Sequence, residues 1–149
     1  LISFQWQKPL LSEIHKISGW TGVLTIIFHS VLLLENHYVP YKIGEILIPF
    51  SAHNDPVNSA LGTISFYLFL LVMATSDFFT KRMGQRLWKN IHFLVIPAWI
   101  LMTLHGLFMG TDSGQPWAIF IYSLGAALII TLLGFRYFES RYKMQIKQK

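Results

Sequence analysis

Cysteine is absent from this sequence of 149 residues, and charged residues make up only 13% of it. The absence of cysteine excludes disulfides, thiolate metal sites, iron–sulfur clusters and a cysteine nucleophile. A soluble domain has about a quarter of its residues charged, whereas 53% of this chain is hydrophobic and the mean hydropathy is +0.46. The composition indicates a membrane protein and argues against a secreted, disordered or nucleic-acid-binding chain.

No cleavable signal peptide is visible in the N-terminal region of this sequence. Lys8 and Lys16 precede an apolar run, but no small-residue cleavage site follows that run. The chain begins with Leu1 instead of Met, so we expect a fragment or an incomplete N-terminus. Internal repeats and low-complexity tracts are absent from the sequence, which predicts a single transmembrane domain over residues 1–149.

Four long apolar runs predict four transmembrane helices, and hence an all-α membrane protein. The runs cover residues 17–34, 57–75, 93–109 and 117–135. Each run is close to the roughly 20 residues that cross a hydrocarbon core about 30 Å thick. Only helices or closed barrels span lipid, and continuous apolar runs without alternation indicate helices. Buried helices of a large soluble protein are the alternative, but they would leave almost no polar surface.

The basic residues predict how these helices are oriented. Eleven of the twelve Lys and Arg residues fall on one side of the predicted membrane: Lys8, Lys16, Lys81, Arg82, Arg86, Lys89, Arg136, Arg141, Lys143, Lys147 and Lys149. The other side has Lys42 alone. Cytoplasmic loops carry the excess of Lys and Arg. We therefore expect both termini and the 76–90 loop in the cytoplasm, the 36–56 and 110–116 loops outside, and the plasma (inner) membrane as the location.

Four of the six histidines lie in the predicted spans or at their ends. His15 and His29 belong to the first span, and His92 and His105 belong to the third. Ionisable groups within spans are costly and usually functional. The orientation places His15 and His92 near the inner face and His29 and His105 near the outer face. One histidine from each of two helices at each depth is what two bis-imidazole hemes require. A single heme, or purely structural histidines, remain open.

The spacing of the histidines agrees with two hemes in the first predicted helix and conflicts with them in the third. His15 and His29 are fourteen residues apart, nearly four turns, so they share a face about 21 Å apart along the axis. His92 and His105 are thirteen residues apart, which puts them roughly 140° apart on an ideal helix. Pro97 lies between them and removes a backbone donor, so a kink or a change of winding is expected there.

Several other residues are candidates for cofactor contacts. Gly22 is seven residues from both His15 and His29, where it would let a bulky cofactor approach, although ordinary helix packing explains it equally well. Trp99 is seven residues after His92 and either lies between two hemes or simply packs. His37 and His53 belong to the outer loop, where they are solvated or contact a propionate, a metal or an acceptor.

Segments of three helices together resemble the ferric reductase-like transmembrane family, which includes ferric-chelate reductases, NADPH oxidases and the heme subunit of the methionine-sulfoxide reductase. Residues 14–20, Ile-His-Lys-Ile-Ser-Gly-Trp, followed by His29, resemble the oxidase pattern. The third helix has Trp88, His92 and Leu-His-Gly at 104–106, similar to the family pair of histidines thirteen apart. Residues 61–63 and 74–76, Leu-Gly-Thr and Ala-Thr-Ser, resemble the family's preceding helix.

The resemblance implies two b-type hemes stacked across the membrane, with His15 paired with His92 and His29 with His105. It also implies that this chain supplies the last four helices of a six-helix core, with further helices or subunits elsewhere. Residues 136–149 contain no nucleotide- or flavin-binding segment, so we expect a separate electron donor, either a flavoprotein or quinol, and an outer-face acceptor. The basic clusters set topology and attract anionic lipid, or they dock the donor; Lys16 and Arg86 would alternatively anchor heme propionates.

Three functions compete on this basis. The first is transmembrane electron transfer by a heme subunit of an oxidoreductase. The second is a terminal ferric or oxygen reductase acting at the outer heme, and the third is a non-redox membrane protein with structural histidines. The sparse positive charge outside, Lys42 with His37 and His53, does not favour attraction of ferric chelate anions.

Overall fold

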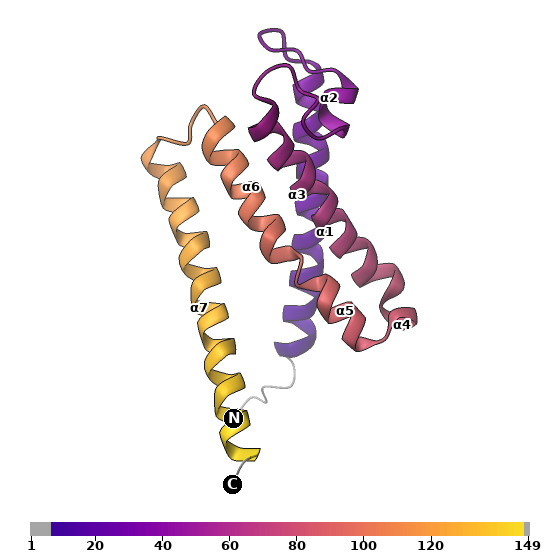
Figure 1. The fold of residues 1–149 in the computed structure, drawn as a ribbon, viewed down its shortest axis with the longest axis vertical. Coiled ribbons are helices and arrows are strands. Elements are labelled where there is room, and N and C mark those ends of the chain that lie inside the picture. The colour runs from indigo at the N-terminus through magenta and orange to yellow at the C-terminus, as the bar shows by residue number, and fades with distance from the viewer. Residues whose placement is uncertain (1–6, 148–149) are drawn as a thin grey trace. The chain divides into compact units, whose positions relative to one another are not determined.

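The computed structural model describes residues 7–147, and every regular element in that range is helical (Figure 1). In chain order the elements are α1 (Gln7–Leu34), α2 (Ile43–Leu47), α3 (Pro56–Ala74), the π-helical segment η1 (Thr75–Phe79), α4 (Thr80–Met83), α5 (Gln85–His92), α6 (Val95–Met109) and α7 (Pro116–Lys147). Within residues 7–147, four stretches are long and apolar enough to cross a membrane, namely Pro9–Leu34, Pro56–Met83, Gln85–Met109 and Pro116–Glu139. The predicted all-α membrane fold with four spans is confirmed.

The chain divides into two compact units. The first extends to Met109 and holds α1 to α6, and the second begins at Gly110 and holds α7. Helix α7 continues beyond its apolar run as far as Lys147. Within the first unit we call the end that carries residues 76–92 the basic end, and the end that carries residues 35–55 the loop end.

Helix α3 is the centre of the first unit. It packs along α6 and also against α1. Its buried side chains include Ala60, Ser65 and Val72. The few buried residues of the neighbouring helices include Ala98 of α6 and Val23 of α1. Small side chains at such contacts let helix backbones approach closely, which is how helices associate where lipid removes the usual hydrophobic driving force.

Two glycines bring α1 against α3. A Cβ at Gly19 would lie 2.6 Å from the sulfur of Met73, and a Cβ at Gly22 would lie 3.3 Å from the Phe69 ring. The opposite face of α1 exposes large apolar side chains such as Leu24 and Phe28. An apolar surface of this kind is normal for a helix that faces lipid.

At the basic end, the helix that begins as α3 changes from α-helical to π-helical winding. Helix α3 passes into the π-helical turn η1, and Thr80 donates its hydroxyl proton to the carbonyl oxygens of Thr75 and Ser76. The chain then reverses at Gly84, whose φ of 73° suits glycine and few other residues. Single π-helical turns inside α-helices occur frequently at functional sites.

The third span is broken between α5 and α6, between its two histidines. Phe93 and Leu94 form the break, which is followed three residues later by Pro97. Pro97 cannot donate to the carbonyl of Phe93, and its ring clashes with that carbonyl in a regular helix. The amides of Leu94 and Ile96 instead bond three residues back, to Ile91 and Phe93. Turns with bonds three residues apart rotate the chain more per residue than an α-helix does. This extra rotation is in the direction that brings two histidines thirteen residues apart toward the same face.

Candidate metal-binding sites

The four histidines of the spans form two pairs in the structure. The imidazole centroids of His15 and His92 are 6.0 Å apart, with the ring planes at 61°. Those of His29 and His105 are 6.5 Å apart, with the planes at 78°. Each pair joins α1 to the broken third span, one at the basic end and the other at the loop end. These are the two pairs that the depth argument predicts.

The distances suit a metal ion shared by two imidazoles. A bond from a metal to an imidazole nitrogen is about 2 Å, so two rings on opposite sides of one metal have centroids roughly 6 Å apart. Among the described residues, no group of three or more His, Cys, Asp and Glu side chains is placed to hold a metal. Two protein ligands per metal fit heme iron, because the porphyrin supplies the remaining nitrogen ligands.

The contacts of His105 fix which of its nitrogens is available. Its Nδ1 lies 2.8 Å from the main-chain carbonyl oxygen of Asn58, at the start of α3. A carbonyl oxygen only accepts, so Nδ1 carries the proton and Nε2 of the neutral ring is left with a free lone pair. The ring also lies against Gly62, where an added Cβ would come within 2.8 Å of Cε1. The absence of a side chain at Gly62 therefore makes room for this histidine.

His92 has a different set of neighbours. Its Nδ1 lies 3.2 Å from the hydroxyl oxygen of Ser76 in η1. The indole N–H of Trp88 donates to the same oxygen, also at 3.2 Å. The Trp88 ring stacks on the imidazole, with centroids 5.1 Å apart and planes at 29°. His92 is thus held by a side-chain network, whereas His105 is held by the main chain.

An acidic residue connects α1 to η1 beside the basic-end pair. Asp77 accepts a hydrogen bond from the indole N–H of Trp20 and lies 3.4 Å from the ammonium group of Lys16. Lys16, a predicted cofactor contact, is therefore an ion-pair partner of Asp77 in this structure. Arg86, the other predicted basic contact, is exposed on α5 near the same end.

The remaining predicted residues lie within the first unit. Gly22 lies against Phe69, which is the close packing of α1 on α3 that the sequence allows as an alternative to cofactor contact. Trp99 is partly buried on α6, and its role beside a cofactor stays a prediction. His37 is exposed in the loop that follows α1.

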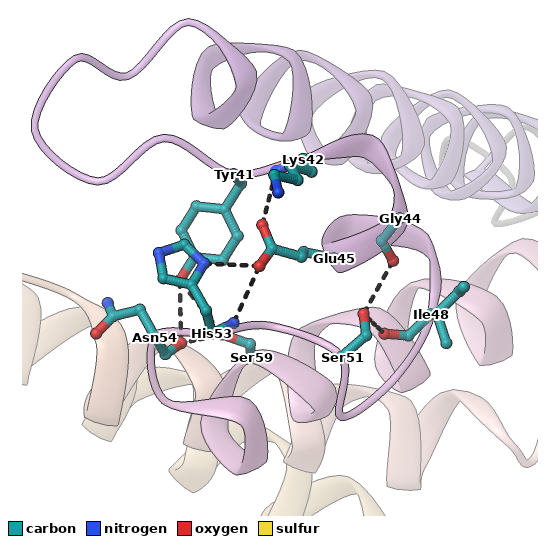
Figure 2. Close-up of polar contacts among 9 residues, drawn as sticks. All are labelled: Tyr41, Lys42, Gly44, Glu45, Ile48, Ser51, His53, Asn54 and Ser59. Atoms are coloured by element: carbon teal, nitrogen blue, oxygen red, sulfur yellow. Dashed lines mark hydrogen bonds and ion pairs between the residues drawn. The ribbon is translucent and has the colours of Figure 1, made fainter.

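The loop end is organised around Glu45 (Figure 2). Its carboxylate accepts from the backbone N–H of Lys42 at 2.8 Å and contacts both the backbone N–H and the ring of His53, the ring at 2.6 Å. The hydrogen bond from Lys42, followed by that from His53, lowers the pKa of Glu45 from 4.5 to about 2. Two α3 hydroxyls, of Thr63 and Tyr67, donate to carbonyl oxygens of α2. His53 is therefore a structural partner of Glu45 in this loop.

The supporting contacts of several residues are absent from the sequence-based prediction. Gly62 and Ser76 lie in the segments that carry the family resemblance, but nothing in their spacing reveals contact with a histidine. Trp88 precedes His92 by four residues, so both share a helical face, and this signal could have identified the stack. The contact of His105 with the Asn58 carbonyl is not visible in sequence, because any residue offers the same main-chain group.

Comparison with known proteins agrees with this arrangement. A family model described as "Ferric reductase like transmembrane component" matches residues 1–103, which is most of the chain and includes His15, His29 and His92. No solved structure gives a significant match. Members of this family bind heme, and the match points to transmembrane electron transfer. The chain belongs to the ferric reductase-like transmembrane component family.

Proposed function

We propose that this chain transfers electrons across the membrane through two b-type hemes, one held by His15 and His92 and the other by His29 and His105. The observation that carries the proposal is the pair of imidazole distances, 6.0 and 6.5 Å, at two levels of the same helices. A bis-imidazole heme supplies one-electron chemistry, since its iron alternates between ferrous and ferric states without binding substrate.

The protein residues would position and insulate these groups. Helix α1 offers one histidine at each end on a single face, and the break at Phe93 and Leu94 lets the third span offer the other two. The Asn58 carbonyl accepts from Nδ1 of His105, and the Ser76 hydroxyl can accept from Nδ1 of His92, so Nε2 of each ring would be the ligand. The apolar helices and the surrounding lipid would keep water away from both pairs, which favours electron transfer over side reactions.

We also propose a direction for the transfer. The basic end, with Lys81, Arg82, Arg86 and Lys89, would face the cytoplasm, as the excess of Lys and Arg predicts. A separate flavoprotein would then dock there, or quinol would supply electrons from the membrane. An acceptor would meet the loop end. Lys16 and Arg86 remain candidates for contact with heme propionates at the basic end.

An absorption spectrum of the purified protein tests the proposal most directly. Sharp α and β bands on reduction, with two hemes per chain, are the expected result for two bis-histidine sites. One heme per chain would contradict the two-site arrangement. No heme, in a protein purified with added heme, would overturn electron transfer and favour a non-redox membrane protein.

The orientation is tested with single cysteines, since the native chain has none. Ser51→Cys and Gln85→Cys place exposed thiols at the loop end and the basic end respectively. A membrane-impermeant thiol reagent added to intact cells should label position 51 and not position 85. Lysed cells, in which both positions react, provide the control. Labelling of position 85 in intact cells would reverse the proposed direction.

Docking of the donor is tested by charge reversal. Arg82→Glu with Arg86→Glu should slow heme reduction by a flavoprotein donor and weaken its dependence on ionic strength, because exposed charges are screened beyond about 10 Å at 0.1 M salt. Heme content of the variant serves as the control. An unchanged rate with both hemes retained would favour supply by quinol.

A further inference from the structure

A three-residue cluster at the basic end carries an inference beyond ligation itself. The hydroxyl oxygen of Ser76 lies 3.2 Å from both the His92 Nδ1 and the Trp88 Nε1. Trp88 also stacks on His92. The cluster joins the π-helical segment η1 to α5, so the unusual winding of η1 occurs where Ser76 must reach the imidazole.

The direction of each hydrogen bond follows from the chemistry of the donors. An indole N–H only donates, so Ser76 Oγ accepts from Trp88. When Nε2 of His92 binds a metal, the proton resides on Nδ1, which then donates to the same oxygen. Ser76 Oγ therefore accepts two hydrogen bonds, and each weakens the oxygen as an acceptor for the other.

The acceptor matters because it controls how strongly the imidazole donates electrons to a metal. A hydrogen bond from the far ring nitrogen raises the basicity of the ligand nitrogen. His105 donates at 2.8 Å to the Asn58 carbonyl, whereas His92 shares the Ser76 hydroxyl with Trp88 at 3.2 Å. The longer, shared bond gives His92 less of this basicity.

We propose that Ser76 and Trp88 are positioning residues that hold His92 in its Nδ1–H form, and that they act on the reduction potential of the basic-end iron in opposite directions. The Ser76 hydroxyl lowers this potential by accepting from His92, and Trp88 offsets part of that effect by sharing the same acceptor. This inference rests on the proposed function. Trp88 acts through Ser76, and Ser76 acts through His92; neither is a ligand.

The test is a potentiometric titration of the purified holoprotein, followed by heme absorption. Ser76→Ala removes the acceptor and should shift the midpoint potential of the basic-end iron upward. Trp88→Phe keeps an aromatic ring beside His92 but removes the competing donor, so Ser76 accepts more strongly and the potential should fall. Ser76→Thr keeps a hydroxyl and should restore a value close to that of the native protein.

Opposite shifts, confined to one of the two components, distinguish this arrangement from general loss of packing. The His105→Ala protein, which retains only the basic-end iron, assigns the components. Ser123→Ala and Trp117→Phe on α7 remove the same groups from the other unit and provide matched controls. If Ser76→Ala loses the basic-end heme, recovery of that heme in Ser76→Thr supports the positioning role. The Trp88→Phe variant then still tests the predicted direction of the potential shift.

Shifts of the same sign, shifts in the loop-end component, or unchanged potentials with both hemes retained would overturn the inference alone. A native protein without bis-histidine heme bands would instead overturn the proposed function. The two failures are therefore distinguishable in the same set of spectra.

Discussion

The two ends of the first unit hold similar histidine pairs by different means. The ring centroids are 6.0 Å apart at the basic end and 6.5 Å apart at the loop end. At the basic end His92 depends on two side chains, Ser76 and Trp88. At the loop end His105 depends on a main-chain carbonyl and on the missing side chain of Gly62.

This difference determines what substitution can change. A side-chain acceptor can be strengthened, weakened or removed by mutation, so the environment of His92 is adjustable. A main-chain acceptor survives any substitution at Asn58 that preserves the start of α3, so the environment of His105 is sensitive only to space. Substitution can therefore change the hydrogen bonding of the histidine at the basic end, whereas at the loop end it can change only the space around the histidine.

Removal of a ligand should have the largest effect and should separate the two ends. His105→Ala removes one of the two protein ligands at the loop end, and its partner alone cannot hold a six-coordinate low-spin iron. Heme per chain should fall from two toward one, and His92→Ala should do the same at the basic end. Heme extraction and low-temperature spectra of both variants provide the measurement.

His37→Ala is the control for these variants, because His37 is an exposed loop histidine outside both pairs. Full heme content with a low-spin spectrum in His105→Ala would show that His105 is not a ligand. The same result in His92→Ala would remove the basic-end site.

Filling the space beside His105 should perturb the loop end alone. The Cβ of Gly62→Ala would lie 2.8 to 3.0 Å from three atoms of the His105 ring, so the ring must move. Overpacking of this kind costs about 1–3 kcal/mol, equivalent to roughly a five- to 150-fold loss of affinity at one site. Heme titration of the apoprotein should show one weakened and one unchanged component.

Gly134→Ala is the matched control, because an added Cβ there meets nothing within 4 Å. In a helix interior this change should stabilise by up to about 1 kcal/mol. Equal weakening of both sites by Gly62→Ala would mean that the substitution loosens the whole unit.

Much of this fold follows from the sequence, because lipid imposes simple demands. Four apolar runs of sufficient length must be helices, and the histidines at matching depths predict the pairs that the structure brings together. The thirteen-residue spacing of His92 and His105 conflicts with a straight helix, and Pro97 correctly indicates where the conflict is relieved. The break itself falls at residues 93–94, at the carbonyl that Pro97 leaves without its usual donor.

The supporting contacts could not be predicted in the same way. No residue pattern distinguishes the π-helical turn at Thr75–Phe79 from an ordinary helix. This turn places Ser76 beside His92 and Asp77 beside Lys16. The role of Gly62 depends on how closely α6 approaches α3, which periodicity does not specify. Whether Gly22, Trp99, Lys16 and Arg86 contact a cofactor stays a prediction.

Loss of the Asp77 carboxylate should weaken the basic end more modestly. Asp77→Ala leaves the partly buried Trp20 indole N–H without its acceptor, so we expect a loss toward the low end of the about 1–3 kcal/mol that a buried donor costs. The pair with the half-exposed Lys16 contributes only about 0–1 kcal/mol. Thermal denaturation should therefore show a clear loss for Asp77→Ala and a small one for Lys16→Met.

Asp77→Asn keeps an acceptor for Trp20 and removes the charge, so it separates the two contributions. It should behave like Lys16→Met. If Asp77→Asn is as destabilising as Asp77→Ala, the ion pair rather than the indole hydrogen bond holds α1 against η1.

The smallest effect expected is a pH dependence confined to the loop end. The pKa of Glu45 in the folded loop, about 2, lies below its ordinary value of 4.5. The carboxylate therefore stabilises the folded loop fully above pH 4.5, and this contribution is lost as the pH falls from 4.5 toward 2. Protonation weakens the bonds from Lys42 and His53 that hold α2 in place. Amide hydrogen exchange over residues 43–53, corrected for the intrinsic rate at each pH, should accelerate through this interval.

The variant Glu45→Gln should remove this pH dependence and exchange faster at neutral pH, because it has no carboxylate to lose. Glu35→Gln, a change of the same kind at an exposed position before the loop, should leave the pH dependence in place. If exchange in Glu45→Gln retains the native pH profile, another group controls the loop. If residues 76–92 accelerate together with residues 43–53, the two ends unfold as one unit and their independence is wrong. A transition restricted to residues 43–53 would instead show that the loop end opens without disturbing the pair of His15 and His92.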